Sequence, residues 1–338
     1  MKRVVIWVLL LVIIVIGAFG VWVTLGEVQP YKGYTSEEQF VDIPSGSGPG
    51  AIGRRLADAG VIRDTLSFRI ELLRSGTGRR LQAGEYRFDK PMTVNEVIAK
   101  IARGDVYLLP ITFREGLTIR EMAALYESKG FGAAAGFLAA ASDARPVHAF
   151  DPGAKDLEGY LFPDTYNMPR QSTAAQLVGR MVAGFEKVLT PELRGQAERR
   201  GLSVRELVTL ASIVEKETGK AEERPLVAAV YANRLKIGMG LQCDPTVIYA
   251  LQRLDRYNGN LTRDDLQLDS AYNTYRYRGL PPGPIAAPGR ASLEAAANPA
   301  DVPYLYFVSR GDGSHVFATT LDEHNHNVYE FQKKPFMR

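Results

Sequence analysis

Residues 203–219 read SVRELVTLASIVEKETG, and this stretch decides how the rest of the chain is interpreted. Ser203, with Glu206 three positions later, forms the pattern of a capping box, so a helix is predicted to begin here and to end at Gly219. Glu215 and Glu217 stand at its far end, where the helix dipole disfavours negative charge. That position tends to raise a carboxyl pKa, as burial does, and a raised pKa is what a general acid needs near neutral pH.

The two glutamates are not equivalent on this helix. At about 100° per residue their side chains point roughly 200° apart, so one cleft can hold only one of them. Glu217 continues the bulkier apolar stripe that contains Leu210 and Ile213. It is therefore the better candidate for desolvation, and we predict that it is the catalytic acid. Glu215 is expected to support it through a salt bridge or a hydrogen bond, and Glu223 is a second supporting carboxylate.

Composition limits the classes of protein. The chain has 338 residues, 46% of them hydrophobic, which suits two or three domains. Its net charge of +3 is too small to indicate a nucleic-acid partner. The motifs of serine hydrolases, zincins and P-loop proteins are absent. The single cysteine, Cys243, excludes an intrachain disulfide and is interpreted as a small filler. His324 and His326 lack a third ligand motif, so we expect no metal and no cofactor.

The N-terminus predicts a membrane anchor. Lys2 and Arg3 precede an uncharged apolar run over residues 4–25, about 22 residues, which is long enough to cross a bilayer as one helix. A cleaved signal peptide would have a shorter apolar core and a small-residue cleavage site. The positive-inside rule keeps the N-terminus cytoplasmic and places the rest outside the cytoplasmic membrane. Residues 1–25 are thus the cytoplasmic start and transmembrane anchor, and residues 26–40 a linker.

Two folded parts are expected beyond the linker. Residues 41–108 alternate short strands and helices, with a capping box at Thr93, and resemble a LysM-like module of cell-wall proteins. Residues 109–338 form the larger part, with a capping box at Thr118 and helical periodicity from Thr173 to Leu235. Short strands are predicted late in that part, at 303–310 and 315–320. Because helices and strands are segregated, the predicted fold class is α+β rather than a doubly wound sheet.

A second cluster of polar residues lies after the helical region. Asn273 and Tyr275 belong to a Tyr-rich run beside a Pro/Gly-rich loop, a composition suited to a cleft floor that stacks on sugars and hydrogen-bonds them. Gln242 and Asp244, which flank the cysteine, are further substrate-binding candidates. Composition alone does not separate a carbohydrate cleft from a peptide cleft.

Four long runs, in this order, resemble the YceG family of endolytic murein transglycosylases, the MltG type. They are ASIVEKET, NRLKIGMGLQCDPTVIYA, AYNTYRYRGLPPGPIAAPG and YLYFVSRGDGSHVFATTLDEHN. The likeness extends from the N-terminal anchor to the end of the chain. One position departs from the pattern, because Cys243 stands where Thr or a similar small polar residue is expected. That difference leaves the fold unaffected but puts a polar contact from this side chain in doubt.

The resemblance implies an enzyme at the outer face of the cytoplasmic membrane that cuts peptidoglycan strands between MurNAc and GlcNAc. It would leave 1,6-anhydro-MurNAc ends without consuming water, using one Glu first as acid and then as base. Lytic transglycosylases commonly carry that acid as Glu followed by Ser or Thr, and Glu217 precedes Thr218. Glycan strands, the membrane and peptidoglycan synthases are the implied partners.

Two other functions stay open on the sequence. One is a non-catalytic cell-wall-binding scaffold of the synthesis or division machinery. The other is a glycan hydrolase that uses Asp244 or Glu223 as a second carboxylate, which would produce reducing ends instead of anhydro ends.

Overall fold

The computed structural model describes residues 7, 10–15, 17 and 29–336. The predicted anchor over residues 4–25 falls largely outside these residues, and among those described no helix is both long and apolar enough to cross a membrane. Contacts divide the chain into two compact units. One comprises Met1–Leu109 with Asn167–Gln171, and the other comprises Pro110–Tyr166 with Ser172–Arg338.

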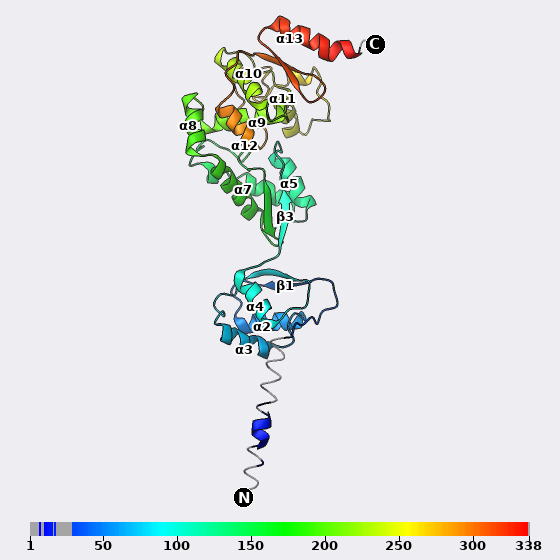
Figure 1. The fold of residues 1–338 in the computed structure, drawn as a ribbon. Helices are drawn as coiled ribbons and strands as arrows, with labels where there is room; N and C mark the ends of the chain where they lie inside the picture. The colour runs from blue at the N-terminus through cyan, green and yellow to red at the C-terminus, as the bar shows by residue number, and fades with distance from the viewer. Residues whose placement is uncertain (1–6, 8–9, 16, 18–28, 337–338) are drawn as a thin grey trace. The chain divides into compact units, whose positions relative to one another are not determined.

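The first unit is a small sandwich of helices on a two-stranded sheet (Figure 1, blue to cyan). Its elements are β1 (Gln39–Ile43), α2 (Pro49–Asp58), α3 (Thr65–Ser75), β2 (Gly84–Phe88) and α4 (Val94–Arg103). The strands pair antiparallel, with Val41 opposite Tyr86, and both side chains are buried in the core with Phe68 of α3. The sequence patterns did not predict α3, whose N-cap Asp64 accepts a hydrogen bond from the Ser67 amide at 2.8 Å.

Capping boxes predicted from the sequence are confirmed in both units. Thr93 caps α4, and the Glu96 carboxylate accepts the Thr93 amide at 2.7 Å. Thr118 caps α5 with Glu121 in the same way. Each box satisfies backbone N–H groups that have no partner inside their helix.

The elements from β3 to the C-terminus contain most of the helices. They are β3 (Leu108–Thr112), α5 (Ile119–Ser128), α6 (Ala134–Ala141), η1 (Arg145–Val147), β4 (Thr165–Pro169), α7 (Ala174–Val188), α8 (Pro191–Arg199), α9 (Val204–Glu217), α10 (Arg224–Lys236), α11 (Asp244–Arg253), η2 (Asp265–Gln267), α12 (Arg290–Ala297), β5 (Tyr306–Ser309), β6 (His315–Ala318), α13 (Leu321–Val328), η3 (Tyr329–Lys333) and η4 (Lys334–Phe336). Among the described strands, β3 pairs with β4 and β5 with β6, each as a separate two-stranded sheet. This mixed arrangement fits the predicted α+β class.

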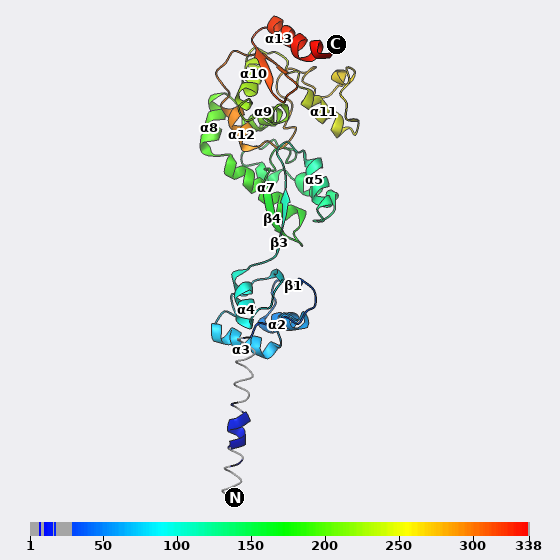
Figure 2. The same ribbon diagram turned by 45° about the vertical axis from the view of Figure 1, so that its right-hand side comes forward.

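The second unit is built around α9. This helix packs against α8, α10, α11 and α12, and both ribbon views show it among them (Figures 1 and 2). Ser203 forms the predicted capping box with Glu206, and every residue from Leu207 to Val214 is buried. The helix ends at Glu217, two residues before the predicted stop, because Thr218 takes an extended conformation. Its C-terminal end therefore carries Glu217 out of an apolar core.

Candidate active site

Glu217 is the partly buried last residue of α9. Its Oε1 accepts two hydrogen bonds, from the Tyr231 hydroxyl of α10 at 2.6 Å and from the Cys243 thiol at 3.1 Å. Its Oε2 accepts none from any residue that the structure describes. Burial raises the pKa of Glu217 above its ordinary value, although the bonds from Tyr231 and Cys243 act in the opposite direction. One oxygen is thus fixed by two donors, and the other has no hydrogen-bond partner among the described residues.

Both donors to Glu217 keep their own protons near neutral pH. Burial, followed by the nearby charge of Glu217 among the other causes, raises the pKa of the Cys243 thiol, and burial also raises that of the Tyr231 hydroxyl. The Cys243 amide donates to the Thr274 hydroxyl at 3.0 Å, which fixes the residue at the start of α11. Cys243 is therefore more than the filler expected from the sequence, because its thiol itself makes the polar contact that had been in doubt.

Glu215 faces a different set of partners. The Arg224 guanidinium lies 3.3 Å from its Oε1, and the Gly289 amide donates to its Oε2 at 2.9 Å. Arg224 also lies 3.4 Å from Glu115, and the two glutamates line a cavity of about 290 Å³. Both oxygens of Glu215 are occupied, by contacts of the kind expected of a supporting residue. Its part in catalysis stays a prediction.

Glu223 is hydrogen-bonded to His315 of the β5–β6 hairpin. Its carboxylate accepts the His315 amide at 2.9 Å, lies 2.7 Å from the ring Nδ1, and accepts the Thr218 hydroxyl at 3.1 Å. Burial alone would raise the pKa of Glu223, but these bonds outweigh it and lower that pKa. The contact holds the imidazole in place near Glu217, whose pKa His315 lowers slightly.

Tyr231 and His315 are the two site residues that sequence reasoning missed. Both lie inside runs that it examined, but Tyr231 comes from the next helix and His315 from a distant hairpin. No spacing relates either residue to Glu217. The only available signal was that His315 lies inside one of the four family-like runs and that Tyr231 lies two residues before another.

Asp244, Tyr275 and Gln242 are exposed. The Tyr275 hydroxyl donates to Asp244 Oδ1 at 2.6 Å, and Asp244 is close enough to raise the pKa of Glu217. Gln242 adopts a left-handed backbone conformation with φ of 51°, which is uncommon outside glycine. Its backbone N–H donates to the Thr274 carbonyl oxygen at 3.2 Å. Exposed polar groups beside Glu217 suit a bound sugar, and their contact with substrate stays a prediction.

Asn273 requires a correction. Its side chain is 0% exposed, and its amide nitrogen donates to the carbonyls of Leu266 and Leu268 at 3.0 and 2.8 Å. Its amide oxygen accepts the Tyr275 N–H at 3.0 Å. These bonds occupy the polar atoms of Asn273 inside its own loop, so the residue holds the loop that presents Tyr275 instead of reaching sugar.

The comparisons place this chain in a known family. The profile of the YceG-like family matches residues 41–330. The chain belongs to this family. The resemblance inferred from the four sequence runs is thereby confirmed.

Similar proteins carry a common name. The chain is 33% identical over 300 residues to the endolytic murein transglycosylase of Bacillus subtilis, covering 84% of this chain and 82% of that relative. It is 32% identical over 346 aligned residues to the endolytic murein transglycosylase of Streptococcus pneumoniae, covering 93% of this chain but only 62% of that longer relative. A crystal structure of a yceG-like protein from Listeria monocytogenes superposes with a TM-score of 0.58 at 32% identity, over 86% of this chain and 98% of that one.

Proposed function

We propose that this YceG-like chain is a membrane-anchored endolytic transglycosylase. It cuts nascent murein strands between MurNAc and GlcNAc and leaves 1,6-anhydro-MurNAc ends, with Glu217 as the single acid and base. The state of the Glu217 carboxyl is the main support for this proposal. One of its oxygens is fixed by two neutral donors, the other is free, and its pKa is raised. The names of the relatives support the same activity and substrate.

The chemistry follows from the two oxygens of Glu217. The proton on Oε2 passes to the glycosidic oxygen, and the bond from that oxygen to C1 of MurNAc breaks. The carboxylate then takes the proton of the same sugar's O6 hydroxyl, and O6 bonds to C1 to close the anhydro ring. Because the nucleophile is already attached to the reacting sugar, no second carboxylate is needed to position a water. Tyr231 and Cys243 donate to the carboxylate while it is charged.

Glu217 is favoured over Glu215 on geometry. Glu215 has a cation on one oxygen and a backbone amide on the other, so neither oxygen is free to carry a proton toward substrate. Glu217 has only neutral donors on one oxygen, which leaves it able to hold a proton between turnovers.

The hydrolase alternative needs a second carboxylate, and Asp244 and Glu223 are its two candidates. The contacts of Glu223 disfavour one of them. Glu223 is engaged by His315 and Thr218, whereas Asp244 is exposed and accepts only the Tyr275 hydroxyl among the bonds formed by described residues. Asp244 is therefore the residue through which hydrolysis would have to proceed. The scaffold alternative gives no reason for a desolvated carboxyl with a free oxygen.

Membrane anchoring belongs to the same proposal. The uncharged run over residues 4–25 follows two cationic residues, which supports a topology with the folded units outside the cytoplasmic membrane, where peptidoglycan and its synthases are found. Alkaline phosphatase fused after Arg338 should be active in cells, because that enzyme folds only outside the cytoplasm. A silent fusion, at normal protein level, would overturn this topology.

Mass spectrometry of the products tests the activity. Purified full-length chain in detergent is incubated with isolated peptidoglycan, and the new glycan ends are identified. The proposal predicts anhydro-MurNAc ends. Reducing ends would establish the hydrolase, and uncut strands that still bind the protein would establish the scaffold.

A further inference from the structure

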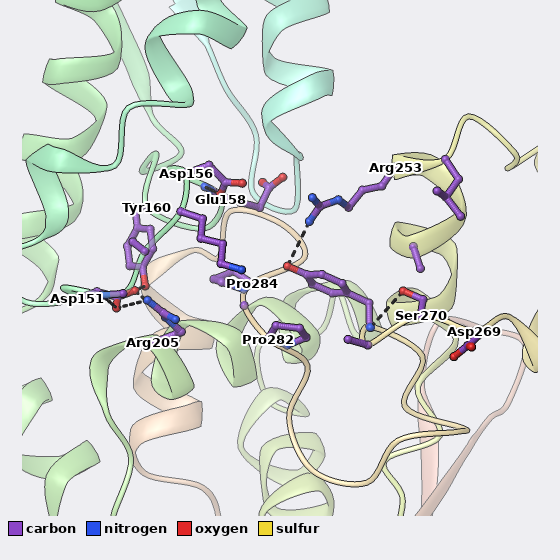
Figure 3. Close-up of a pocket in the computed structure, with 18 residues that line it drawn as sticks. Asp151, Asp156, Glu158, Tyr160, Arg205, Arg253, Asp269, Ser270, Pro282 and Pro284 are labelled. Atoms are coloured by element: carbon purple, nitrogen blue, oxygen red, sulfur yellow. Dashed lines mark hydrogen bonds and ion pairs between the residues drawn. The ribbon is translucent and has the colours of Figure 1, made fainter.

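A polar cavity of about 380 Å³ lies away from Glu217, at the opposite ends of α9 and α11 (Figure 3). Arg205, in the first turn of α9, and Arg253, the last residue of α11, both line it. The rise of α9 puts Arg205 about 18 Å along the helix from Glu217. The transglycosylase chemistry described above uses none of the residues of this cavity.

One wall of the cavity is a closed network. Arg205 binds Asp151 through two bonds, Nε to Oδ2 at 3.0 Å and Nη2 to Oδ1 at 2.6 Å, and the buried Tyr160 hydroxyl donates to the same carboxylate. Figure 3 shows this trio across the cavity from Arg253, with Pro282 and Pro284 between them. Because its charges satisfy one another, this wall gives the cavity a fixed shape and no free charge.

The cavity also carries two cations, Arg253 and Lys155, that form no ion pair with a carboxylate in the described part of the chain, although Asp156 is near enough to Arg253 to raise its pKa. Arg253 makes one long contact of 3.4 Å with the Tyr272 hydroxyl, and its guanidinium lies 5.3 Å from the centre of that ring. Lys155 is exposed at the edge of the cavity. Stacking on Tyr272 holds the guanidinium in place while leaving most of its N–H donors open to a carboxylate.

Two carboxylates of the same cavity each accept a hydrogen bond on only one of their two oxygens. Asp156 accepts the Glu158 amide at 3.0 Å through Oδ1, and Asp269 accepts the Tyr277 hydroxyl at 2.6 Å through Oδ1. The Oδ2 of each accepts no hydrogen bond from the described residues. The cavity therefore offers open sites for both negative and positive groups, which a neutral glycan does not need.

The distance to Glu217 matches a peptide on the same substrate. The helix α11 begins at Asp244 beside Glu217 and ends at Arg253, a rise of about 13–14 Å. Murein carries short peptide stems with free carboxylates and an amine, and four residues of extended chain span at most about 13–14 Å. A stem on a sugar held at Glu217 can thus reach the cavity along α11.

We propose that this cavity binds the peptide stem of murein, with Arg253 and Lys155 receiving its carboxylates and Asp156 and Asp269 its amine. The inference rests on the proposed transglycosylase function and adds a substrate contact to it. It makes the enzyme prefer strands that carry stems over strands from which an amidase has removed them.

The test compares two substrates and three variants of the full-length chain. The ratio of kcat/KM on stem-bearing strands to kcat/KM on stripped strands is measured for the wild type, for Arg253→Gln and for the matched surface control Arg199→Gln on α8. We expect the ratio to fall about tenfold in Arg253→Gln, as for the loss of one charge-assisted hydrogen bond, and to stay at the wild-type value in Arg199→Gln. Lys155→Gln should lower the ratio in the same direction.

A binding measurement separates recognition from folding effects. The free peptide L-Ala-γ-D-Glu-L-Lys-D-Ala should perturb the wild-type NMR signals of Arg253 and Tyr272, and the perturbation should weaken in Lys155→Gln. A ratio that is equal in wild type and Arg253→Gln, or no perturbation by the peptide, overturns the inference. Either result leaves the proposed function standing if anhydro ends still form. Absence of anhydro ends with both substrates would instead remove the proposed function.

Discussion

Glu215 and Glu217, on the two sides of the last turn of α9, have the same side chain but different hydrogen-bond partners. Glu215 meets a guanidinium and a backbone amide, and both of its oxygens are taken. Glu217 meets a phenol and a thiol on one oxygen only, in a setting whose burial raises its pKa. The first arrangement ties α9 to its neighbours, and the second keeps a proton available. On the proposed roles, the chemistry of the hydrogen-bond partners, more than residue type or position along a helix, would separate a structural carboxylate from an acid.

The largest effect is expected from Glu217→Gln. Gln keeps the size and the hydrogen bonding of the side chain but carries no transferable proton, so production of anhydro ends should fall by about two to four orders of magnitude. The matched change Glu215→Gln removes half of an ion pair and should lower the melting temperature while retaining most of the turnover. Normal activity in folded Glu217→Gln, together with an inactive folded Glu215→Gln, would reverse the two roles.

Glu158 extends the comparison to a carboxyl outside the active site. It is buried, and its oxygens accept only neutral donors, the Ile119 amide at 3.0 Å and the Tyr249 hydroxyl at 3.1 Å. Burial, opposed in part by the Ile119 amide, raises its pKa from 4.5 to about 8. The folded state thus holds a proton that the unfolded chain releases above its own lower pKa.

The contribution of Glu158 to stability should therefore be greatest below the ordinary glutamate pKa of 4.5 and should fall as pH rises toward about 8. The loss due to this group is at most about 1.4 kcal/mol per pH unit. Urea unfolding across this range should show that Glu158→Gln removes this part of the slope, whereas the exposed control Glu186→Gln keeps it. Identical slopes in wild type and Glu158→Gln would show that burial with neutral donors does not hold this proton.

A smaller effect is expected at Asn273. Replacing it by Ala leaves the partly buried carbonyls of Leu266 and Leu268 and the Tyr275 amide without their partner, which should cost about 1–3 kcal/mol of stability. Tyr275→Ala, at an exposed position, should instead reduce turnover with little change in melting temperature. The assignment of Asn273 to loop support fails if Asn273→Ala melts normally but binds glycan poorly.

The smallest effects are expected from the two donors on Glu217, and they should have opposite signs. Tyr231→Phe removes a bond that lowers the pKa of Glu217, so the basic limb of kcat/KM against pH should move to higher pH. Cys243→Thr replaces a weak thiol donor by a stronger hydroxyl and should move that limb to lower pH. Each shift should be less than about one pH unit. Shifts in the same direction would mean that these donors do not set the proton affinity of Glu217.

Local sequence signals predicted the parts of the fold that local interactions determine. The capping boxes at Thr93, Thr118 and Ser203 are formed within a single turn, so their residue pattern is sufficient to locate them. The opposite directions of Glu215 and Glu217 follow from helix geometry alone. The helix α3 was missed, because its start rests on Asp64 and Ser67, without the Glu or Gln of a full capping box.

The site contacts that the sequence did not reveal are all non-local. Tyr231 and Cys243 contact Glu217 from α10 and from the start of α11. His315 contacts Glu223 from a hairpin 92 positions later in the chain. Asn273 was misassigned because an amide suits both a sugar and a loop. Only its burial, which depends on how the loop folds back on itself, distinguishes the two.

Titration of the Glu217 carboxyl tests most directly whether the fold keeps this group protonated. Carbon-13 NMR of the full-length chain labelled at the glutamate carboxyls would follow this group through pH, with Glu217→Gln identifying its signal. We expect a midpoint clearly above the ordinary glutamate value of 4.5, so that the group retains a proton to donate. A midpoint at or below 4.5 would contradict the claim that the fold keeps Glu217 protonated for catalysis.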